Sequence, residues 1–184
     1  MLKVIKYPNP ILKKVAEPVR IFDEALKKIV DAMYETMYAS YGIGLAAPQV
    51  ADSRRFFVID IHYRPEENEL INKDPMVFIN PEIIKKEEDI IWEEGCLSLP
   101  GLLIPVKRSK KIILKAQDLE GSFIEIQAED LKAVCIQHEL DHLNGVLLTD
   151  KLTKEELTLF KKKMERGEIL RIESEDEHHP ALMG

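Results

Sequence analysis

The chain has 184 residues, enough for one domain with a sizeable core, and 45% of them are hydrophobic, as in compact globular proteins. Its net charge of −7 argues against a general nucleic-acid binder, so we expect no DNA partner. No stretch is long and apolar enough to span a membrane, and no signal or transit peptide is evident after Met1. With two cysteines, a disulfide framework is not expected, and these features predict a cytoplasmic protein.

The predicted elements begin with a helix after Asp23, where apolar residues recur at helical spacing. Strands are predicted at residues 55–61, 76–80, 83–92, 111–118 and 123–127, with a hairpin turn at 118–122. A second helix is predicted at about 129–144. A third begins at Thr153, which forms a capping box with Glu156, and ends near Gly167.

This order of elements predicts an α+β fold, in which antiparallel or mixed sheets pack around the second helix, with one helix before it and one after it. Residues 1–167 are expected to form a single domain. Residues 168–184 form an acidic C-terminal tail that is expected to be flexible and to leave His178 and His179 in solvent. His62 is expected in a loop.

The most informative segment is residues 137–142, Gln-His-Glu-Leu-Asp-His, in the second predicted helix. His138 and His142 are four residues apart, so both imidazoles lie on one helix face and can reach one metal ion. Glu139 lies where a carboxylate can take a proton from a metal-bound water. The pattern also arises by chance, but these groups would be costly to bury without a metal. The segment therefore predicts metal-assisted hydrolysis.

A catalytic site of this kind needs a third protein ligand and one position left for water. Leu148 stands where metzincins have their third histidine, and Lys162 stands where thermolysin-like enzymes supply a glutamate. Cys135 and His142 lie roughly 10 Å apart along the helix, too far for one ion, so Cys135 is better placed as an apolar wall residue. The expected third ligand is Cys96, in a turn bounded by glycine and proline, and such a set suits zinc.

Three segments resemble the motifs of the peptide deformylase family. Residues 94–98 are similar to its EGCLS motif, residues 138–142 to its HExDH motif, and residues 42–49 to its GxGLAAxQ motif. The motifs occur in the family's order, and the resemblance covers roughly residues 4–152. It implies a hydrolase that removes the N-formyl group from the N-terminal formylmethionine of newly made polypeptides and releases formate. It also implies Fe(II) as the native metal, with Zn(II), Ni(II) and Co(II) forms known in the family.

The resemblance also implies roles for individual residues. Glu139 would act as general base and then acid while metal-bound water attacks the formyl carbon. The Gln49 side chain and the backbone N–H of Leu97 would stabilise the oxyanion, although Gln49 alone would be read as a loop amide. Gly44 would let the substrate backbone approach as an added strand, unless it serves only a positive φ angle. The pocket for the methionine side chain would be lined by residues that could equally be ordinary core: Ile43, Leu131, Val134 and Cys135.

Two further readings stay open at this point. Asp141 could orient a metal ligand or pair with Arg108, or it could form a surface ion pair of little energetic value, and Glu94 shares this ambiguity. The last predicted helix carries several lysines. Its basic surface is read as a solvated face, whereas the resemblance implies docking on the ribosome.

Two other functions compete with the deformylase reading. A zincin-type endopeptidase would need a third ligand downstream of the histidines. A metal-stabilised protein that binds peptide N-termini would tolerate the loss of Glu139, and a purely structural metal site would normally have four protein ligands.

Overall fold

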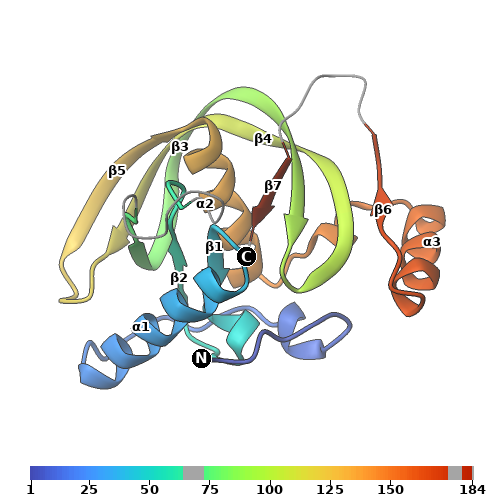
Figure 1. The fold of residues 1–184 in the computed structure, drawn as a ribbon. Helices are drawn as coiled ribbons and strands as arrows, with labels where there is room; N and C mark the ends of the chain where they lie inside the picture. Colours follow the sequence, from blue (N-terminus) through green and yellow to red (C-terminus); the bar gives the residue numbers. More distant parts are fainter. Residues whose placement is uncertain (64–72, 174–179, 184) are drawn as a thin grey trace.

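The computed structural model describes residues 1–63, 73–173 and 180–183 (Figure 1). Its helices are α1 (Glu24–Ala39), α2 (Asp130–Leu143) and α3 (Lys154–Glu165), with short 3-10 helices η1 (Pro10–Lys13), η2 (Ala47–Val50) and η3 (Leu148–Lys151). Its strands are β1 (Gly44–Ala46), β2 (Phe56–Ile59), β3 (Met76–Cys96), β4 (Leu99–Gln117), β5 (Phe123–Glu129), β6 (Leu170–Arg171) and β7 (Pro180–Met183). None of the helices in these residues is long and apolar enough to cross a membrane.

The main sheet has the strand order β1-β2-β3-β4-β5, and each neighbouring pair is antiparallel. Figure 1 shows that β3, β4 and β5 curve around α2, which lies inside the bend. The short strands β6 and β7 add in parallel to β4 and β3. The expected α+β fold, with mixed strands around the helix that carries both histidines, is therefore confirmed.

The core forms because each element has one apolar side to bury. The predicted stripe of α1 packs on β1 and β2, where Leu26, Val30 and Met33 are completely inaccessible to solvent. α2 is buried over most of its circumference, and Val134 and Ile136 join Phe57 and Phe78 of the sheet in a second cluster. A helix enclosed in this way keeps its polar side chains rigid and shielded from water.

Three strand predictions were wrong in their bounds. Residues 76–80 and 83–92 belong to one strand, β3, in which Asn80 has a φ angle of 50° and the register shifts before Glu82. β4 begins at Leu99 rather than near residue 111. Pro100, Gly101 and Pro105 hide its first half in the sequence, because these residues ordinarily interrupt a strand pattern.

The signals for turns and helix ends were more reliable. The turn at 118–122 is closed by hydrogen bonds between Asp118 and both Gly121 and Ser122. The capping box of α3 is formed, since the backbone N–H of Thr153 donates to the Glu156 carboxylate and the Glu156 N–H donates to the Thr153 hydroxyl.

The segment after Gly167 differs from its prediction. The sequence predicted no strand there, yet β6 and β7 both lie beyond this glycine. The predicted positions of His178 and His179 lie outside the described residues. His62 is exposed in a turn that follows β2, as expected.

Candidate active site

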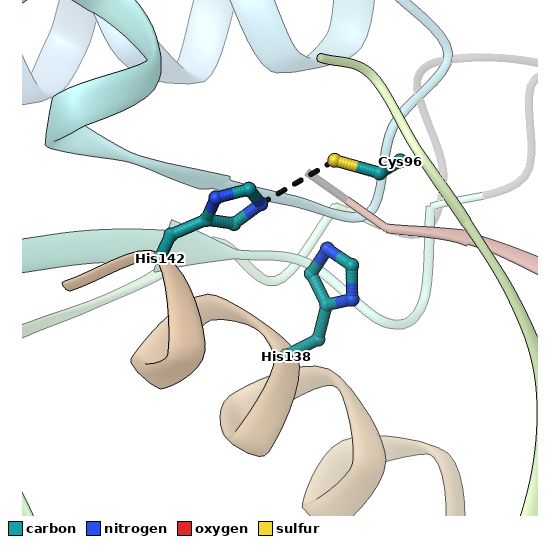
Figure 2. A group of neighbouring side chains, drawn as sticks. All are labelled: Cys96, His138 and His142. Carbon is teal, nitrogen blue, oxygen red and sulfur yellow. Dashed lines mark hydrogen bonds between the residues drawn. The ribbon is translucent and has the colours of Figure 1, made fainter. Parts of the chain in front are cut away.

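The three predicted metal ligands lie together where β3 ends beside α2 (Figure 2). The Sγ atom of Cys96 is 3.4 Å from Nε2 of His142, and the ring centroids of His138 and His142 are 5.0 Å apart. One ligand atom from each residue lies within 4.8 Å of the others, and all three side chains are buried. A thiolate and two imidazoles within this distance could hold one divalent transition-metal ion.

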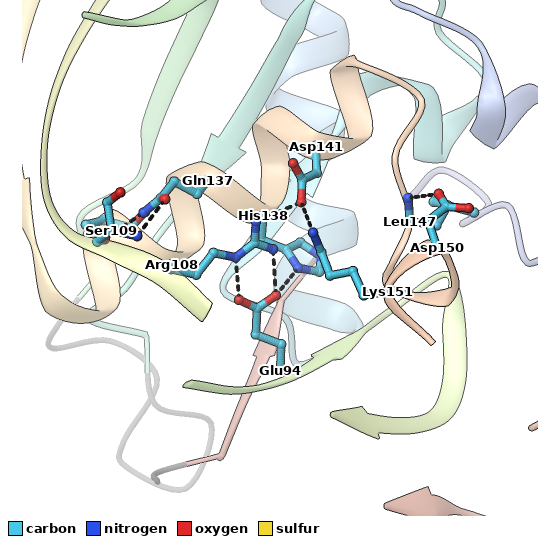
Figure 3. Close-up of polar contacts among 10 residues, drawn as sticks. Glu94, Arg108, Ser109, Gln137, His138, Asp141, Leu147, Asp150 and Lys151 are labelled. Carbon is cyan, nitrogen blue, oxygen red and sulfur yellow. Dashed lines mark hydrogen bonds and ion pairs between the residues drawn. The ribbon is translucent and has the colours of Figure 1, made fainter. Parts of the chain in front are cut away.

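A buried carboxylate orients the first histidine. Oε2 of Glu94 lies 2.9 Å from Nδ1 of His138 (Figure 3). Because an ionised carboxylate can only accept, Nδ1 carries the proton in this contact, which leaves Nε2 as the nitrogen available to a metal ion. Of the two roles that the sequence left open for Glu94, the structure therefore favours contact with a candidate metal ligand over a surface ion pair.

Arg108 of β4 holds that carboxylate in place. Its Nε and one terminal nitrogen donate to the two oxygens of Glu94 at 2.7 and 2.9 Å, and its other terminal nitrogen donates to Asp141 at 2.7 Å. Arg108 is 7% exposed and Glu94 is 0% exposed. The sequence left open whether Asp141 pairs with Arg108, and the structure shows that it does. The pair belongs to a largely buried network.

These contacts determine the charges around the site. Burial would raise the pKa of the Glu94 carboxyl, but the hydrogen bonds and charges of Arg108 and His138 outweigh it and lower the pKa to about 2. Burial would lower the pKa of Arg108, whereas its two carboxylate partners raise it above the ordinary value. Glu94 is thus an anion and Arg108 a cation throughout the physiological range.

Gln137 attaches α2 to β4 on the far side of this network. Its side-chain oxygen accepts from the backbone N–H of Ser109 at 3.0 Å, and its amide nitrogen donates to the Ser109 carbonyl at 2.8 Å (Figure 3). Ser109 directly follows Arg108, so one short stretch of β4 positions both the helix and the carboxylate beside His138.

Gly44 lies against Glu139, the predicted acid–base residue, which is 0% exposed. A Cβ atom added to Gly44 would lie 2.3 Å from Oε1 of Glu139 and 3.1 Å from Sγ of Cys135. Gly44 is not among the glycines with positive φ angles. Close packing against Glu139, and not backbone conformation, therefore requires a glycine here.

Gln49 is directed into the site and is not a solvated loop amide. It is 0% exposed, and its side-chain oxygen accepts from the backbone N–H of Ala46 at 2.9 Å. Its amide nitrogen donates to the Ser98 hydroxyl at 3.0 Å and lies 3.8 Å from Sγ of Cys96. The amide is thereby held with its donor end beside the expected metal ligand.

Leu97 occupies the tight connection between β3 and β4 directly after Cys96. The Lys6 ammonium donates to its carbonyl at 2.5 Å, and the backbone N–H of Tyr7 donates to the carbonyl of Ser98 at 2.9 Å. The N-terminal segment therefore fixes the peptide groups that follow the cysteine.

The predicted pocket residues are also brought together. Val134 and Cys135 are completely buried, and Ile43 and Leu131 pack against the same cluster. Burial and the nearby Glu139 raise the pKa of the Cys135 thiol, so it stays neutral and is a poor metal ligand. Trp92 packs against this cluster too and was missed, although its place four residues before Cys96 on the same strand was a usable signal.

Comparisons with known proteins agree with this geometry. A family model described as "Polypeptide deformylase" matches residues 1–158. A peptide deformylase of Thermodesulfovibrio yellowstonii is 46% identical over 163 residues, which cover 89% of this chain and 96% of the relative. One of Acidobacterium capsulatum is 46% identical over 123 residues, covering 67% and 69%. The solved structure of a peptide deformylase from Legionella pneumophila superposes with a TM-score of 0.82 at 40% identity, covering 90% of this chain and 94% of that one.

Proposed function

This chain belongs to the peptide deformylase family, a family of hydrolases that remove N-formyl groups from new polypeptides, and we propose that Cys96, His138 and His142 hold the metal ion for that reaction. The observation that carries the assignment is the buried set of one sulfur and two imidazole ligand atoms within 4.8 Å of one another. Glu94 supports it by fixing the tautomer of His138.

Cys96, His138 and His142 would hold the metal ion, and Glu139 would handle the protons. A divalent ion held there would supply Lewis acidity, which polarises a carbonyl group and lowers the pKa of water toward neutrality. Glu139 accepts the proton of the attacking water and passes it to the departing amine, so that the formyl C–N bond breaks and formate leaves. Its complete burial beside the ligands suits a group that must hold a proton between two steps.

Two donors next to Cys96 stabilise the oxyanion of the attacked formyl group. The amide nitrogen of Gln49 is held 3.8 Å from the cysteine sulfur. The backbone N–H of Leu97 follows the cysteine directly, in a turn that Lys6 holds through the Leu97 carbonyl. Donors that are already in place cost no reorganisation when the charge develops. Removing one such donor typically slows catalysis by about 10²–10³-fold.

The first residue of the substrate is recognised by the apolar cluster next to Glu139. Ile43, Leu131, Val134 and Cys135 line this region, and we add Trp92 to the set. An unbranched, polarisable methionine side chain suits such an irregular apolar wall. Gly44 packs against Glu139, and we propose that the substrate backbone approaches it as an added strand beside that carboxylate.

Iron(II) is the expected native metal, with Zn(II), Ni(II) or Co(II) as alternatives that the same ligands accept. Formylmethionyl nascent chains are the expected partners, and we propose that the reaction takes place in the cytoplasm.

The ribosome is a further expected partner, through α3. Lys154, Lys161, Lys162 and Arg166 of this helix and its end are exposed. Because Phe160 of α3 is 0% exposed, deleting the helix would damage the core, and reversing the charges of Lys161, Lys162 and Arg166 is the better test. Weaker co-sedimentation with ribosomes than for a variant reversed at Lys3, Arg20 and Lys28 is expected, and equal co-sedimentation would contradict docking through α3.

The activity is tested by formate release from formyl-Met-Ala-Ser, using protein loaded anaerobically with Fe(II) or with Ni(II). The wild type is expected to release formate, whereas Glu139→Ala is expected to retain its metal and release almost none. Formate release by both proteins would remove Glu139 from the mechanism. No formate from a folded, metal-loaded wild type would favour a protein that only binds peptide N-termini.

A further inference from the structure

The C-terminal strand β7 is paired with β3 at the edge of the candidate active site. Its four residues run parallel to residues 93–96 of β3, and Met183 is the register partner of the expected metal ligand Cys96. On its other edge the same part of β3 pairs with β4, where Cys96 is the register partner of Leu99. This end of β3 is therefore hydrogen-bonded on both sides, and β7 takes the edge that β4 leaves open.

The strand also lies against α2, the helix that carries His138, Glu139 and His142. Figure 1 shows β7 between the curved sheet and α2. In Figure 2 the pale red ribbon of β7 runs toward the three expected ligands. The chain's own last residues thus reach the place where the reaction is proposed to occur.

A second contact attaches the tail at the point where this pairing starts. Arg171 of β6 donates to both carboxylate oxygens of Glu93 at 2.7 and 2.9 Å. Glu93 is 6% exposed, and it is also the register partner of Pro180, the first residue of β7. The tail is therefore fixed to β3 before the strand begins. Both β6 and β7 lie beyond the residues that the family model matches.

An open strand edge recognises peptides through main-chain hydrogen bonds, which tolerate many side chains. The proposed reaction needs this tolerance, because the substrates share a formylated first residue and differ afterwards. The edge of β3 beside Cys96 is suited to the task, since it adjoins the metal position and ends at it. Each backbone N–H and C=O of that edge can serve only one neighbouring strand at a time.

We propose that β7 occupies the edge of β3 on which the substrate peptide pairs, so that the chain's own C-terminal segment competes with formylated peptides for the active site. This proposal rests on the deformylase function proposed above. The competitor is part of the same molecule, and tethering of this kind commonly gives effective concentrations in the millimolar range. A segment that would bind only weakly as a free peptide is then able to hold the site. The apparent substrate affinity is the intrinsic affinity multiplied by the fraction of molecules in which the edge is free.

The direct test compares the full chain with a variant that ends at Ile172, both loaded with Ni(II), in formate release from formyl-Met-Ala-Ser. We expect KM to fall about 3- to 10-fold on truncation while kcat stays within about twofold, since the tail affects binding and not chemistry. An acetylated Pro-Ala-Leu-Met-Gly peptide should inhibit the truncated protein competitively.

A double variant, Ala181→Pro with Leu182→Pro, separates strand pairing from the length of the chain. It keeps the tail but removes two backbone donors, so it should behave like the truncated protein. The matched control, Ala181→Ser with Leu182→Met, keeps both donors and should behave like the wild type. Arg171→Ala should give an intermediate fall in KM, because it releases the tail from Glu93 only.

The outcomes separate this proposal from the function on which it rests. Formate release with equal KM in the full, truncated and double-proline proteins would overturn the competing tail and leave the deformylase function intact. No formate from any of these folded, metal-loaded proteins would overturn the function, and the tail proposal would be lost with it.

Discussion

Two neighbouring residues of β4 form ion pairs in opposite environments. Lys107 pairs with Asp89 across the hairpin at 2.7 Å, and both side chains are more than 60% exposed. Arg108, the next residue, points to the other face and pairs with Glu94 at 2.7 Å, with side chains that are 6% and 0% exposed. The distances are the same, yet water screens the first pair and not the second. We therefore expect the buried pair to stabilise the fold far more than the exposed one, and of the two pairs only the buried one contacts a candidate metal ligand, His138.

The largest expected effect comes from breaking the buried pair. Arg108→Ala leaves the Glu94 carboxylate buried without its main partner, and removal of one member of such a pair typically costs about 3–5 kcal/mol. We expect a loss of this size in the free energy of unfolding, measured by urea denaturation at pH 7. A loss below about 1 kcal/mol would mean that the environments of Arg108 and Lys107 do not differ as described.

Acid should act on the same pair in the wild type. The pKa of Glu94 is lowered from 4.5 to about 2 in the folded chain, so its ion pair stabilises the fold fully above pH 4.5. That contribution, roughly 3 kcal/mol, should be lost as the pH falls from 4.5 through 2. Urea midpoints measured across this range should decline more steeply for the wild type than for Glu94→Gln. Parallel curves for the two proteins would assign the acid sensitivity to other carboxylates.

Substitution of Glu94 should also weaken the metal site. Glu94→Gln keeps the shape of the side chain but removes the anion that holds the Nδ1 proton of His138. Loss of such a partner typically reduces metal affinity by about 10–100-fold. Competition with a chelator for Zn(II) measures the change, with Asp89→Asn on the exposed stretch of β3 as the matched control. Equal affinities for both variants would remove Glu94 from the metal site.

The smallest effect is expected at the exposed pair. Lys107→Ala should change the free energy of unfolding by no more than about 1 kcal/mol, because solvent and salt already screen its partner. The change should shrink further in 0.5 M NaCl. A loss in the free energy of unfolding as large as that of Arg108→Ala would show that burial does not distinguish the two ion pairs.

The sequence alone was sufficient to bring Cys96, His138 and His142 together as candidate metal ligands, because their signals are local. Two histidines at helical spacing and a single cysteine in a turn specify chemistry that needs few other residues. The pairing of Arg108 was harder to recognise. It lies in a stretch with four basic residues, 107–111, and only the pairing of β3 with β4 shows that it points inward.

The C-terminal strand could not be predicted for a related reason. Four residues after an acidic stretch carry no periodic pattern, and what specifies β7 is an edge of β3 that is distant in sequence. Similarly, the sequence presents Trp92 only as a strand residue. Its packing against the cluster that contains Val134 is visible in the structure alone. Pairing partners that are remote along the chain, and not local propensity, account for both omissions.

The most direct test of the central claim is X-ray absorption spectroscopy at the zinc edge of the Zn(II)-loaded protein. We expect one sulfur ligand at about 2.3 Å together with two imidazole nitrogens at about 2.0–2.1 Å. The sulfur contribution should disappear in Cys96→Ser and persist in Cys135→Ser. Sulfur scattering that survives in Cys96→Ser, or that is absent from the wild type, would contradict a metal centre built from Cys96, His138 and His142.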